Sequence, residues 1–220
     1  MNIELIEYLK NFLSKNDLDG IIINSTNEFL MEYNMLELNS RYHLTGFSGS
    51  TGDVLFTKEK IYQFVDTRYH EQADNEVDHE YVEVIKRPMT QSYLAALNLY
   101  IPAYYKLGIV AKKTSKEFYD KLSAVLKEKN SSIKLLDADP VAEFNNNSSV
   151  DIKYNIFDVS IDIAGVTPDE KFMTIKEYAG DNDFTIIVTS LEDIAYLTNK
   201  RSYDFKCSAV FPAKAIITNN

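Results

Sequence analysis

Cysteine is almost absent from this sequence of 220 residues, in which Cys207 stands alone. A single cysteine excludes a disulfide within the chain and is typical of a reducing compartment, so we expect a cytoplasmic protein. Cys207 lies in a segment that resembles a strand, where a thiol is expected to be buried and inert. Long apolar runs are also missing. The longest, residues 93–105, contains Asn98 and Pro102 and is shorter than the roughly 20 residues that span a membrane.

Basic residues are outnumbered, with 23 Lys and Arg against 33 Asp and Glu, and the formal net charge is −10. Phosphate backbones and anionic lipids repel an acidic surface, which argues against nucleic acid and membranes as partners. The hydrophobic share of 45% and the charged share of 25% are ordinary for a globular protein. The length suits one large domain or two small ones.

Glycine is scarce too, with seven in the chain, and three of them fall within residues 44–53, LTGFSGSTGD: Gly46, Gly49 and Gly52. A phosphate-binding P-loop needs Lys and Ser or Thr after its last glycine, and here Asp53 follows. A dinucleotide fingerprint has a different glycine spacing, and a nucleophile elbow has glycine where Ser50 stands. We therefore interpret the segment as a tight connection between strands, in which glycine permits positive φ angles.

Histidine occurs three times. Residues 70–80, HEQADNEVDHE, are dense in side chains that bind metal ions, but they lack a His-Glu-x-x-His motif and a second cluster of ligands. A solvated acidic helix face is the favoured interpretation. His43 is expected in an alternating strand, and neither it nor Cys207 has the partners of a nucleophilic catalytic set. The residues by themselves therefore predict no active site and no bound cofactor.

Hydrophobic spacing predicts alternating helices and strands over the first part of the chain. Residues 3–13 repeat as an amphipathic helix. Thr114 and Glu117 match a capping box that would begin a later helix. Short apolar segments predict strands, two of them joined as a hairpin by the turn TKEK; the strands cover residues 21–23, 41–47, 53–57, 61–66, 81–85, 106–110 and 133–138, with further helices at 67–77 and 90–101. The pattern predicts an α/β fold, a mixed sheet with helices on both faces.

The polar stretch EFNNNSSVD at residues 143–151 breaks this pattern and predicts a linker. After it, the sequence predicts a helix at 167–180, a strand at 184–190, a helix at 191–200 and strands at 208–212 and 213–218. About 50 residues cannot enclose a full core around a sheet, so we expect the start of a second α/β domain that is cut short. Its last strand would leave an apolar edge without a partner, which predicts self-association through residues 207–218 or a poorly ordered tail.

Two stretches of the first unit, SRYHLTGFSGSTGDVLFT and IYQFVDTRYHEQAD, resemble the N-terminal domain of the creatinase, prolidase and aminopeptidase P family. The family pattern has a strand ending in L-T-G-F-x-G-S-x-G, a hairpin, and W-T-D-x-R-Y before a helix. Phe64 and Val65 stand at the tryptophan and threonine of that motif, and its other three positions are matched by Asp66, Arg68 and Tyr69.

The second unit also resembles this family. AGVTPDEK and TSLEDIAYLTNKRSYDF are similar to two segments of the middle domain in three-domain aminopeptidase P enzymes. Tyr196 replaces a tryptophan and Ser202 a glycine. The Asn-Pro pair of a following Y-N-P-V-F motif is lost, since Ser208 and Ala209 stand there.

The resemblance implies a creatinase-type N-terminal domain with a ribonuclease-H-like motif at residues 1–145, a linker at 146–156 and a truncated second domain of the same type at 157–220. The catalytic pita-bread domain, which holds two divalent metal ions, usually manganese, would be absent, and this chain would bind none. The implied function is the non-catalytic front part of an Xaa-Pro aminopeptidase, which acts on proline-containing peptides. The alternative is a free-standing binding or assembly module derived from the same family.

In relatives this part narrows access to the active site and helps to build a homo-oligomer, such as a dimer. The residues of the glycine segment and of the corner after the hairpin are therefore expected to line a substrate entrance: Phe47, Ser48, Ser50, Phe64, Arg68 and Tyr69. Asp66 is expected to cap the helix that follows it, which leaves Arg68 free to point along the strand ends.

The predicted linker gives a first test. Limited proteolysis should cut first in the stretch FNNNSSV, at residues 144–150, because an exposed polar connection between two folded units is the most accessible backbone. Mass spectrometry of the earliest fragments locates the cut. A first cut within residues 20–65 would contradict the boundary.

Overall fold

The computed structural model describes residues 1–146, 153–180 and 183–218 of the chain. It divides the chain into two compact units, Met1–Val150 and Asp151–Asn220. We call them unit 1 and unit 2 and describe each by itself. Of the predicted linker at 146–156, residues 147–152 lie outside the described residues.

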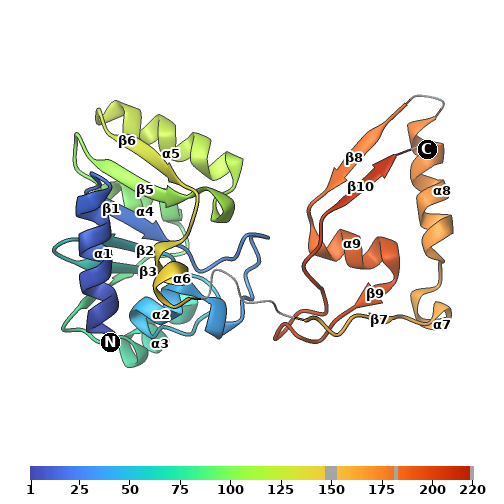
Figure 1. Ribbon diagram of the computed structural model, residues 1–220, viewed down its shortest axis with the longest axis horizontal. Coiled ribbons are helices and arrows are strands. Elements are labelled where there is room, and N and C mark those ends of the chain that lie inside the picture. The colour runs from blue at the N-terminus through green and yellow to red at the C-terminus, as the bar shows by residue number, and fades with distance from the viewer. Residues whose placement is uncertain (147–152, 181–182, 219–220) are drawn as a thin grey trace. The chain divides into compact units, whose positions relative to one another are not determined.

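Unit 1 is built on a six-stranded sheet (Figure 1). Its strands lie in the order β4-β3-β2-β1-β5-β6. β2 runs antiparallel to both β1 and β3, and the other neighbours are parallel. The strands are β1 (Gly20–Ile23), β2 (Val54–Thr57), β3 (Ile61–Val65), β4 (Val82–Lys86), β5 (Lys106–Val110) and β6 (Ser132–Leu136). The predicted mixed sheet and the predicted hairpin are confirmed.

Helices cover both faces of this sheet, as predicted. Successive side chains of a strand point to opposite faces. Ile21 and Ile23 accordingly belong to a core shared with helices α1, α2, α3 and α6, whereas Ile22 belongs to a second core with α4 and α5. The helices are α1 (Ile3–Lys15), α2 (Ser40–Thr45), α3 (His70–Glu76), α4 (Tyr93–Leu99), α5 (Lys116–Glu128) and α6 (Pro140–Phe144), with short 3₁₀ turns η1 (Leu36–Leu38), η2 (Thr67–Tyr69) and η3 (Ala111–Lys113).

Residues 41–47 contradict the prediction of a strand, because residues 40–45 form helix α2 and His43 lies on it. The side chain of Asn39 accepts a hydrogen bond from the Tyr42 amide and so caps the helix start. Gly46 ends the helix with a φ of 78°, a conformation that glycine adopts without steric cost. These caps at both ends outweigh the short alternation of apolar residues that predicted a strand.

The predicted capping box at Thr114 and Glu117 is also wrong. The N-cap of α5 is Ser115, whose hydroxyl accepts a hydrogen bond from the Phe118 amide. The Thr114 hydroxyl instead donates to the carbonyl of Val110, four residues back. Two consecutive residues, Thr114 and Ser115, therefore offered a hydroxyl cap, and the path of the chain out of β5 selected the second.

Unit 2 contains two antiparallel two-stranded sheets, β8–β10 and β7–β9. A complete capping box, formed by Thr167 and Glu170, begins its longest helix. The elements are β7 (Phe157–Asp158), α7 (Ile161–Ala164), α8 (Pro168–Ala179), β8 (Thr185–Val188), α9 (Leu191–Thr198), β9 (Lys200–Arg201) and β10 (Ala215–Thr218). The predicted helices and the strand at 184–190 are confirmed.

Three expectations for unit 2 are corrected. Residues 208–212 form no strand, and only an isolated bridge joins Phe205 to Ser208. Cys207 is exposed rather than buried and has a φ of 64°. The last strand is not without a partner, because β10 pairs along its full length with β8.

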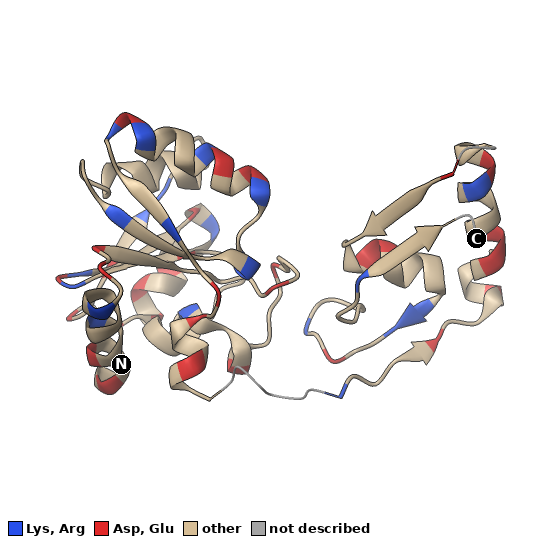
Figure 2. Ribbon diagram, turned by 45° about the horizontal axis from the view of Figure 1, so that its top comes forward, with Lys and Arg blue, Asp and Glu red and all other residues tan. Residues whose placement is uncertain are grey.

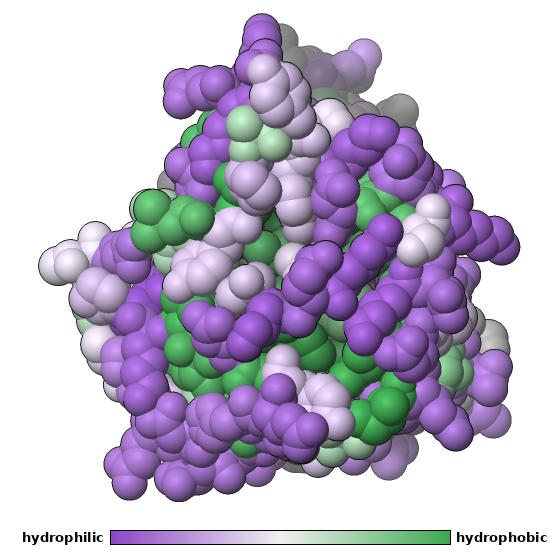
Figure 3. All heavy atoms as spheres, turned by 90° about the vertical axis from the view of Figure 1, so that its left-hand side faces the viewer, coloured by the Kyte–Doolittle hydropathy of each residue, from purple (hydrophilic) through white to green (hydrophobic). Residues whose placement is uncertain are grey.

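One face of unit 1 is mostly polar. The face of unit 1 that is turned to the viewer in Figure 3 is mostly hydrophilic, with apolar side chains visible between polar ones, as is usual for globular proteins. No helix within the described ranges combines the length and the apolar character that crossing a membrane requires.

A buried ion pair joins the last helix of unit 1 to the rest of that unit. Asp139 Oδ2 accepts hydrogen bonds from Lys113 Nζ at 2.6 Å and from Ser40 Oγ at 2.6 Å, and Oδ1 caps α6 by accepting from the Val141 amide. The side chains of Lys113 and Asp139 are only 12% and 6% exposed. Burial opposes ionisation of the Asp139 carboxyl, but the charge of Lys113 and these hydrogen bonds outweigh it and hold its pKa below the ordinary value.

We predict that Asp139→Ala lowers the free energy of unfolding by about 3–5 kcal/mol, because it leaves the Lys113 charge buried without a partner. Since the folded-state pKa of Asp139 is lowered, its contribution is present above the ordinary aspartate pKa of about 4 and is lost as the pH falls below it. Urea denaturation across this pH range measures both effects. Lys116→Ala is the matched control, because its ion pair with Asp120 is exposed and should contribute under about 1 kcal/mol.

Candidate functional site

The glycine segment, residues 46–53, connects helix α2 to strand β2, rather than two strands as predicted. Its conformation depends on glycine at two places, because Gly46 and Gly52 have φ angles of 78° and 122°. A Cβ atom on Gly52 would also lie 2.6 Å from the carbonyl oxygen of Phe64. The expectation that glycine is needed here for positive φ is therefore confirmed at these two positions.

Two of the six expected entrance residues, Phe47 and Phe64, are fully buried, with 0% exposure. Phe47 packs against Tyr69 with ring centroids 5.8 Å apart, and Phe64 lies in the opposite core beside Tyr93 and Tyr100. These two side chains support the segment from within the unit. Exposed atoms remain on the other four residues, namely Ser48, Ser50, Arg68 and Tyr69.

Arg41 lies beneath the glycine segment and is completely buried. Its Nη2 donates to the carbonyl of Gly49 at 2.5 Å, and its guanidinium carbon lies 4.7 Å from the centroid of the Phe47 ring. Its Nε and Nη1 have no hydrogen-bond partner among the described residues. Burial lowers the pKa of Arg41 to about 10, so the side chain stays charged at neutral pH.

Asp53, at the end of the segment, ties it to the residues that follow β1. Its Oδ1 accepts hydrogen bonds from the Ser25 amide at 2.8 Å and from the Ser25 hydroxyl at 3.0 Å. Burial raises the pKa of this carboxyl, and the two bonds from Ser25 and the charge of Arg41 oppose that rise. The sequence alone identified neither Arg41 nor Asp53; the position of Asp53 directly before the buried strand β2 is a signal that could have found it.

The two serines of the segment are hydrogen-bonded to acidic side chains from other elements. The Ser48 amide and hydroxyl both donate to the Glu76 carboxylate at the end of α3, at 2.7 and 2.8 Å. The Ser50 hydroxyl donates to Glu32 at 2.7 Å and lies 2.7 Å from the Tyr69 hydroxyl. The segment thus presents an ordered row of hydroxyl and carboxylate groups.

Asp66 and Arg68 form the corner that follows β3. Asp66 Oδ1 accepts from the Arg68 amide at 3.0 Å, which confirms the predicted cap, although the element it begins is the 3₁₀ turn η2. Arg68 is not free as expected, because its Nε and Nη2 donate to Oδ1 and Oδ2 of Asp66 at 3.0 and 2.9 Å. This side-chain pairing, together with the amide bond, lowers the pKa of Asp66. The Arg68 side chain remains 56% exposed and can accept a further anionic or carbonyl partner.

The acidic run at residues 70–80 is occupied by local contacts. His70 Nε2 lies 3.2 Å from the Arg87 carbonyl, His79 Nε2 lies 2.9 Å from the Asp74 carbonyl, and Asp74 pairs with Lys86. Within the part of the chain that the structure describes, no group of three or more His, Cys, Asp or Glu side chains is placed to hold a metal ion. The arrangement offers hydrogen bonding and one exposed guanidinium.

Two family models match this chain. The Creatinase/Prolidase N-terminal domain matches residues 6–143, and a second model with the same description matches residues 150–220. The two matches lie in tandem and together cover most of the sequence.

Curated relatives show the same relationship over nearly the whole chain. Xaa-Pro aminopeptidase 1 of Dictyostelium discoideum is 28% identical over 96% of this chain, and a probable Xaa-Pro aminopeptidase P of Laccaria bicolor is 24% identical over 98%. Among solved structures, X-prolyl aminopeptidase from Caenorhabditis elegans, described as a cytosolic enzyme with a di-nuclear active site, matches 98% of the chain with a TM-score of 0.85 and 19% identity. The chain spans 34–37% of the length of these three proteins.

The corner at Asp66 gives a prediction that separates the cap from the ion pair. Asp66→Ala removes both and should lower the free energy of unfolding by about 1 kcal/mol. Asp66→Asn keeps an oxygen that can accept from the Arg68 amide, so it should retain most of the capping contribution. Urea denaturation at neutral pH compares the two. Equal midpoints for Asp66→Ala and the unchanged protein would remove the capping role.

Proposed function

Because the chain belongs to the creatinase/prolidase N-terminal domain family, we propose that it forms the non-catalytic N-terminal part of an Xaa-Pro aminopeptidase. Such an enzyme releases the N-terminal residue that precedes proline in a peptide. The proposal rests on the two family matches in tandem, at residues 6–143 and 150–220. It is supported by two relatives named as Xaa-Pro aminopeptidases, whose alignments cover at least 96% of this chain.

The chemistry of the proposed enzyme requires residues outside this chain. Two divalent metal ions, proposed to be manganese, would polarise the peptide carbonyl and activate the attacking water. The side chains of the described residues do not fit such a pair, because they form no group of three or more candidate ligands. The proposed metal centre therefore belongs to the remaining length of the complete enzyme, which we place in the cytoplasm.

The role proposed for this chain is to restrict access to the active site and to support assembly into a homo-oligomer, such as a dimer. Ser48, Ser50, Arg68 and Tyr69 are proposed to line the entrance. Three features support this: the four residues lie on one corner of unit 1, their hydrogen bonds fix their positions, and Arg68 keeps an exposed guanidinium. A guanidinium at an entrance favours peptides through their carbonyl and carboxylate groups.

The alternative proposal is a free-standing binding or assembly module. The two proposals differ in whether the chain acts together with a catalytic domain. Both proposals predict that the chain by itself is inactive, so an activity assay on the chain alone cannot distinguish them. A second experiment must supply a catalytic domain.

We predict that the purified chain releases no N-terminal residue from an Xaa-Pro peptide, with or without manganese, because its described residues form no group that could hold the metal pair. Amino-acid release is measured against a buffer control. Release that is stoichiometric or greater would contradict the absence of a catalytic centre in this chain.

A hybrid protein tests the entrance. This chain replaces the matching segment of the Dictyostelium discoideum enzyme, and hydrolysis of an Xaa-Pro peptide is measured for the hybrid and its Arg68→Ala variant. A role in admitting substrate predicts a higher KM with a smaller change in kcat. Lys116→Ala, a similar loss of an exposed charge on α5, is the matched control. An inactive but folded hybrid favours the free-standing module, and an unchanged KM for Arg68→Ala removes the entrance role.

A further inference from the structure

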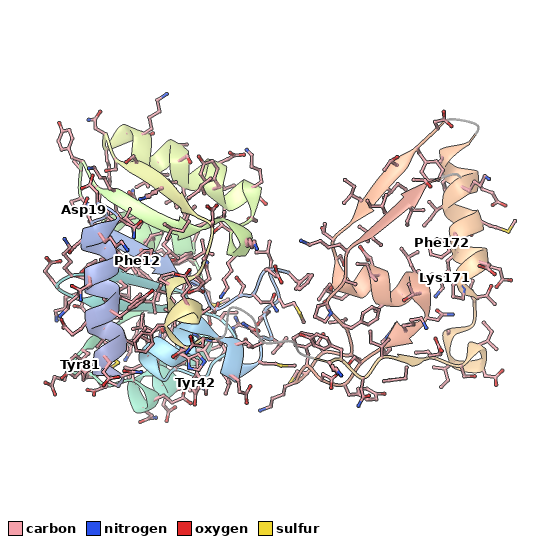
Figure 4. The ribbon with its side chains drawn as sticks, viewed as in Figure 1. Phe12, Asp19, Tyr42, Tyr81, Lys171 and Phe172 are labelled. Carbon is pink, nitrogen blue, oxygen red and sulfur yellow. The ribbon has the colours of Figure 1, made fainter. Side chains whose placement is uncertain are left out.

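Arg41 is completely buried although it lies on a short helix beside the glycine segment. Tyr42, labelled on α2 in Figure 4, and His43 lie on the half-buried side of this helix, whereas Leu44 and Thr45 are fully buried like Arg41. Burying an arginine costs free energy unless its charge and its N–H groups are compensated by neighbouring groups. The contacts of the Arg41 guanidinium therefore indicate what this residue does.

The guanidinium of Arg41 binds backbone rather than a carboxylate. Surface charges on α5 pair with each other: Figure 2 shows basic and acidic residues close together along this helix, where Lys116 pairs with Asp120. Within the described ranges, by contrast, Arg41 Nη2 donates to the carbonyl of Gly49, and Nε and Nη1 have no hydrogen-bond partner. The one hydrogen bond of this buried cation is therefore made to the middle of the glycine segment.

Aromatic rings continue from Arg41 to the corner that follows β3. Its guanidinium carbon lies 4.7 Å from the centroid of the Phe47 ring, the Tyr69 ring meets that ring edge-on at 5.8 Å, and the Arg68 guanidinium lies 5.2 Å from the Tyr69 ring. Cations above aromatic faces and edge-on ring pairs both attract. We call these four side chains the ring stack. It runs from a fully buried cation, Arg41, to an exposed one, Arg68.

Gly49 leaves the space that the ring stack needs. A Cβ atom at this position would lie 2.3 Å from the Phe47 ring and 2.8 Å from the Tyr69 ring, closer than such atoms can approach. Unlike the other two glycines of the segment, Gly49 does not have a positive φ angle. Glycine is therefore needed here for close packing rather than for its backbone conformation.

The ring stack also determines where one surface hydroxyl lies. Ser50 Oγ is 2.7 Å from the Tyr69 hydroxyl and 2.7 Å from the Glu32 carboxylate. An ionised carboxylate can only accept, so Ser50 donates its one proton to Glu32, and the Tyr69 hydroxyl donates to Ser50. The position of the Ser50 hydroxyl thus depends on how the Tyr69 ring is held.

The charge of Arg41 acts on both sides of Gly49. Burial lowers the pKa of Arg41 to about 10, and the charges of Asp53 and Glu76 oppose that change. Asp53 is the last residue of the segment, and Glu76 accepts hydrogen bonds from the amide and the hydroxyl of Ser48. One buried cation therefore balances two carboxylates that hold the segment before and after Gly49.

We propose that Arg41 is a positioning residue of the entrance: through the Gly49 carbonyl and the ring stack, it holds the hydroxyl groups of Ser50 and Tyr69 in place. The inference rests on the entrance proposed above, because that gives the two hydroxyls their function. Arg41 is completely buried, so it contacts no substrate and acts through the segment. Removing it should therefore loosen the segment and, by that route, weaken the contribution of Ser50.

Hydrogen–deuterium exchange on the full chain measures the positioning directly. Arg41→Met removes the charge and the bond to Gly49 while keeping an unbranched apolar stem. The Ser48 amide, which donates to Glu76, should then exchange at least about tenfold faster. The amides of β1 should keep their exchange rates, because a local loosening leaves the sheet intact. Circular dichroism verifies folding.

Two further arginine variants separate this role from a general effect. Arg41→Lys keeps a cation above Phe47 without the planar guanidinium, so its exchange should lie between those of Arg41→Met and the unchanged chain. Arg87→Met is the matched control, because Arg87 Nη1 also donates to a backbone carbonyl, that of Gln91. This control should leave exchange within residues 46–53 unchanged.

Gly49→Ala tests the ring stack without altering a charge. The added methyl group would push the Phe47 and Tyr69 rings apart, so the Ser48 amide should exchange faster, as in Arg41→Met. If Arg41→Met does not fold, Arg41→Lys and Gly49→Ala provide the same test.

The hybrid protein connects the positioning to substrate. Arg41→Met and Ser50→Ala should each raise the KM for an Xaa-Pro peptide with a smaller change in kcat. Because Arg41 acts through Ser50, the double variant should raise KM by no more than about twofold beyond Arg41→Met alone. Effects on KM that multiply in the double variant would mean that Arg41 acts independently of Ser50, and would overturn the proposal.

The positioning and the entrance can fail separately. Unchanged exchange of the Ser48 amide in Arg41→Met, or an equal rise in Arg87→Met or throughout β1, would overturn the role of Arg41, whereas a raised KM for Arg68→Ala would still support the entrance. If exchange rises only in the segment and no variant of Arg41, Ser50 or Arg68 changes KM in an active hybrid, Arg41 positions the segment and the proposed entrance is wrong.

Discussion

Strand β1 is the constraint on which unit 1 depends. Its four residues are all buried, and it binds β2 on one side and β5 on the other. Because its side chains alternate between the two faces, Ile21 and Ile22 belong to separate cores, one under α1 and the other under α4 and α5. A strand buried on both faces leaves little freedom to shift its register, since a slip by one residue would exchange the two cores.

The candidate site depends on this strand through polar contacts rather than apolar packing. Ser25 follows β1 closely and binds Asp53 at the end of the glycine segment. Arg41 holds the middle of the same segment by its bond to the Gly49 carbonyl. Burying a charged arginine or aspartate costs free energy unless neighbouring groups compensate the charge, as Gly49 and Ser25 do here. Ser48 and Ser50 lie on the segment that these buried contacts hold, whereas Arg68 is positioned by Asp66.

Within the described residues, unit 2 has a two-stranded sheet, β8–β10, whereas the sheet of unit 1 has six strands. In unit 1, β3 and β5 complete the sheet, and Leu55 and Phe56 of β2 are fully buried. In unit 2, β10 leaves Ile216 71% exposed.

Local patterns determined much of this protein. The spacing of apolar residues predicted α1 and the hairpin, and the position of Asp66 after a strand predicted its cap. The motifs of both units indicated the family. Tertiary structure decided the rest, because the decisive partners lie far apart in the sequence. Ser40 binds Asp139, 99 residues away, and Ser25 binds Asp53, 28 residues away. Residues 40–45 became a helix because Asn39 and Gly46 cap it, and Arg41 became a buried support because Phe47 and Gly49 close over it. Such contacts depend on how the chain packs, which periodicity and local propensity do not record.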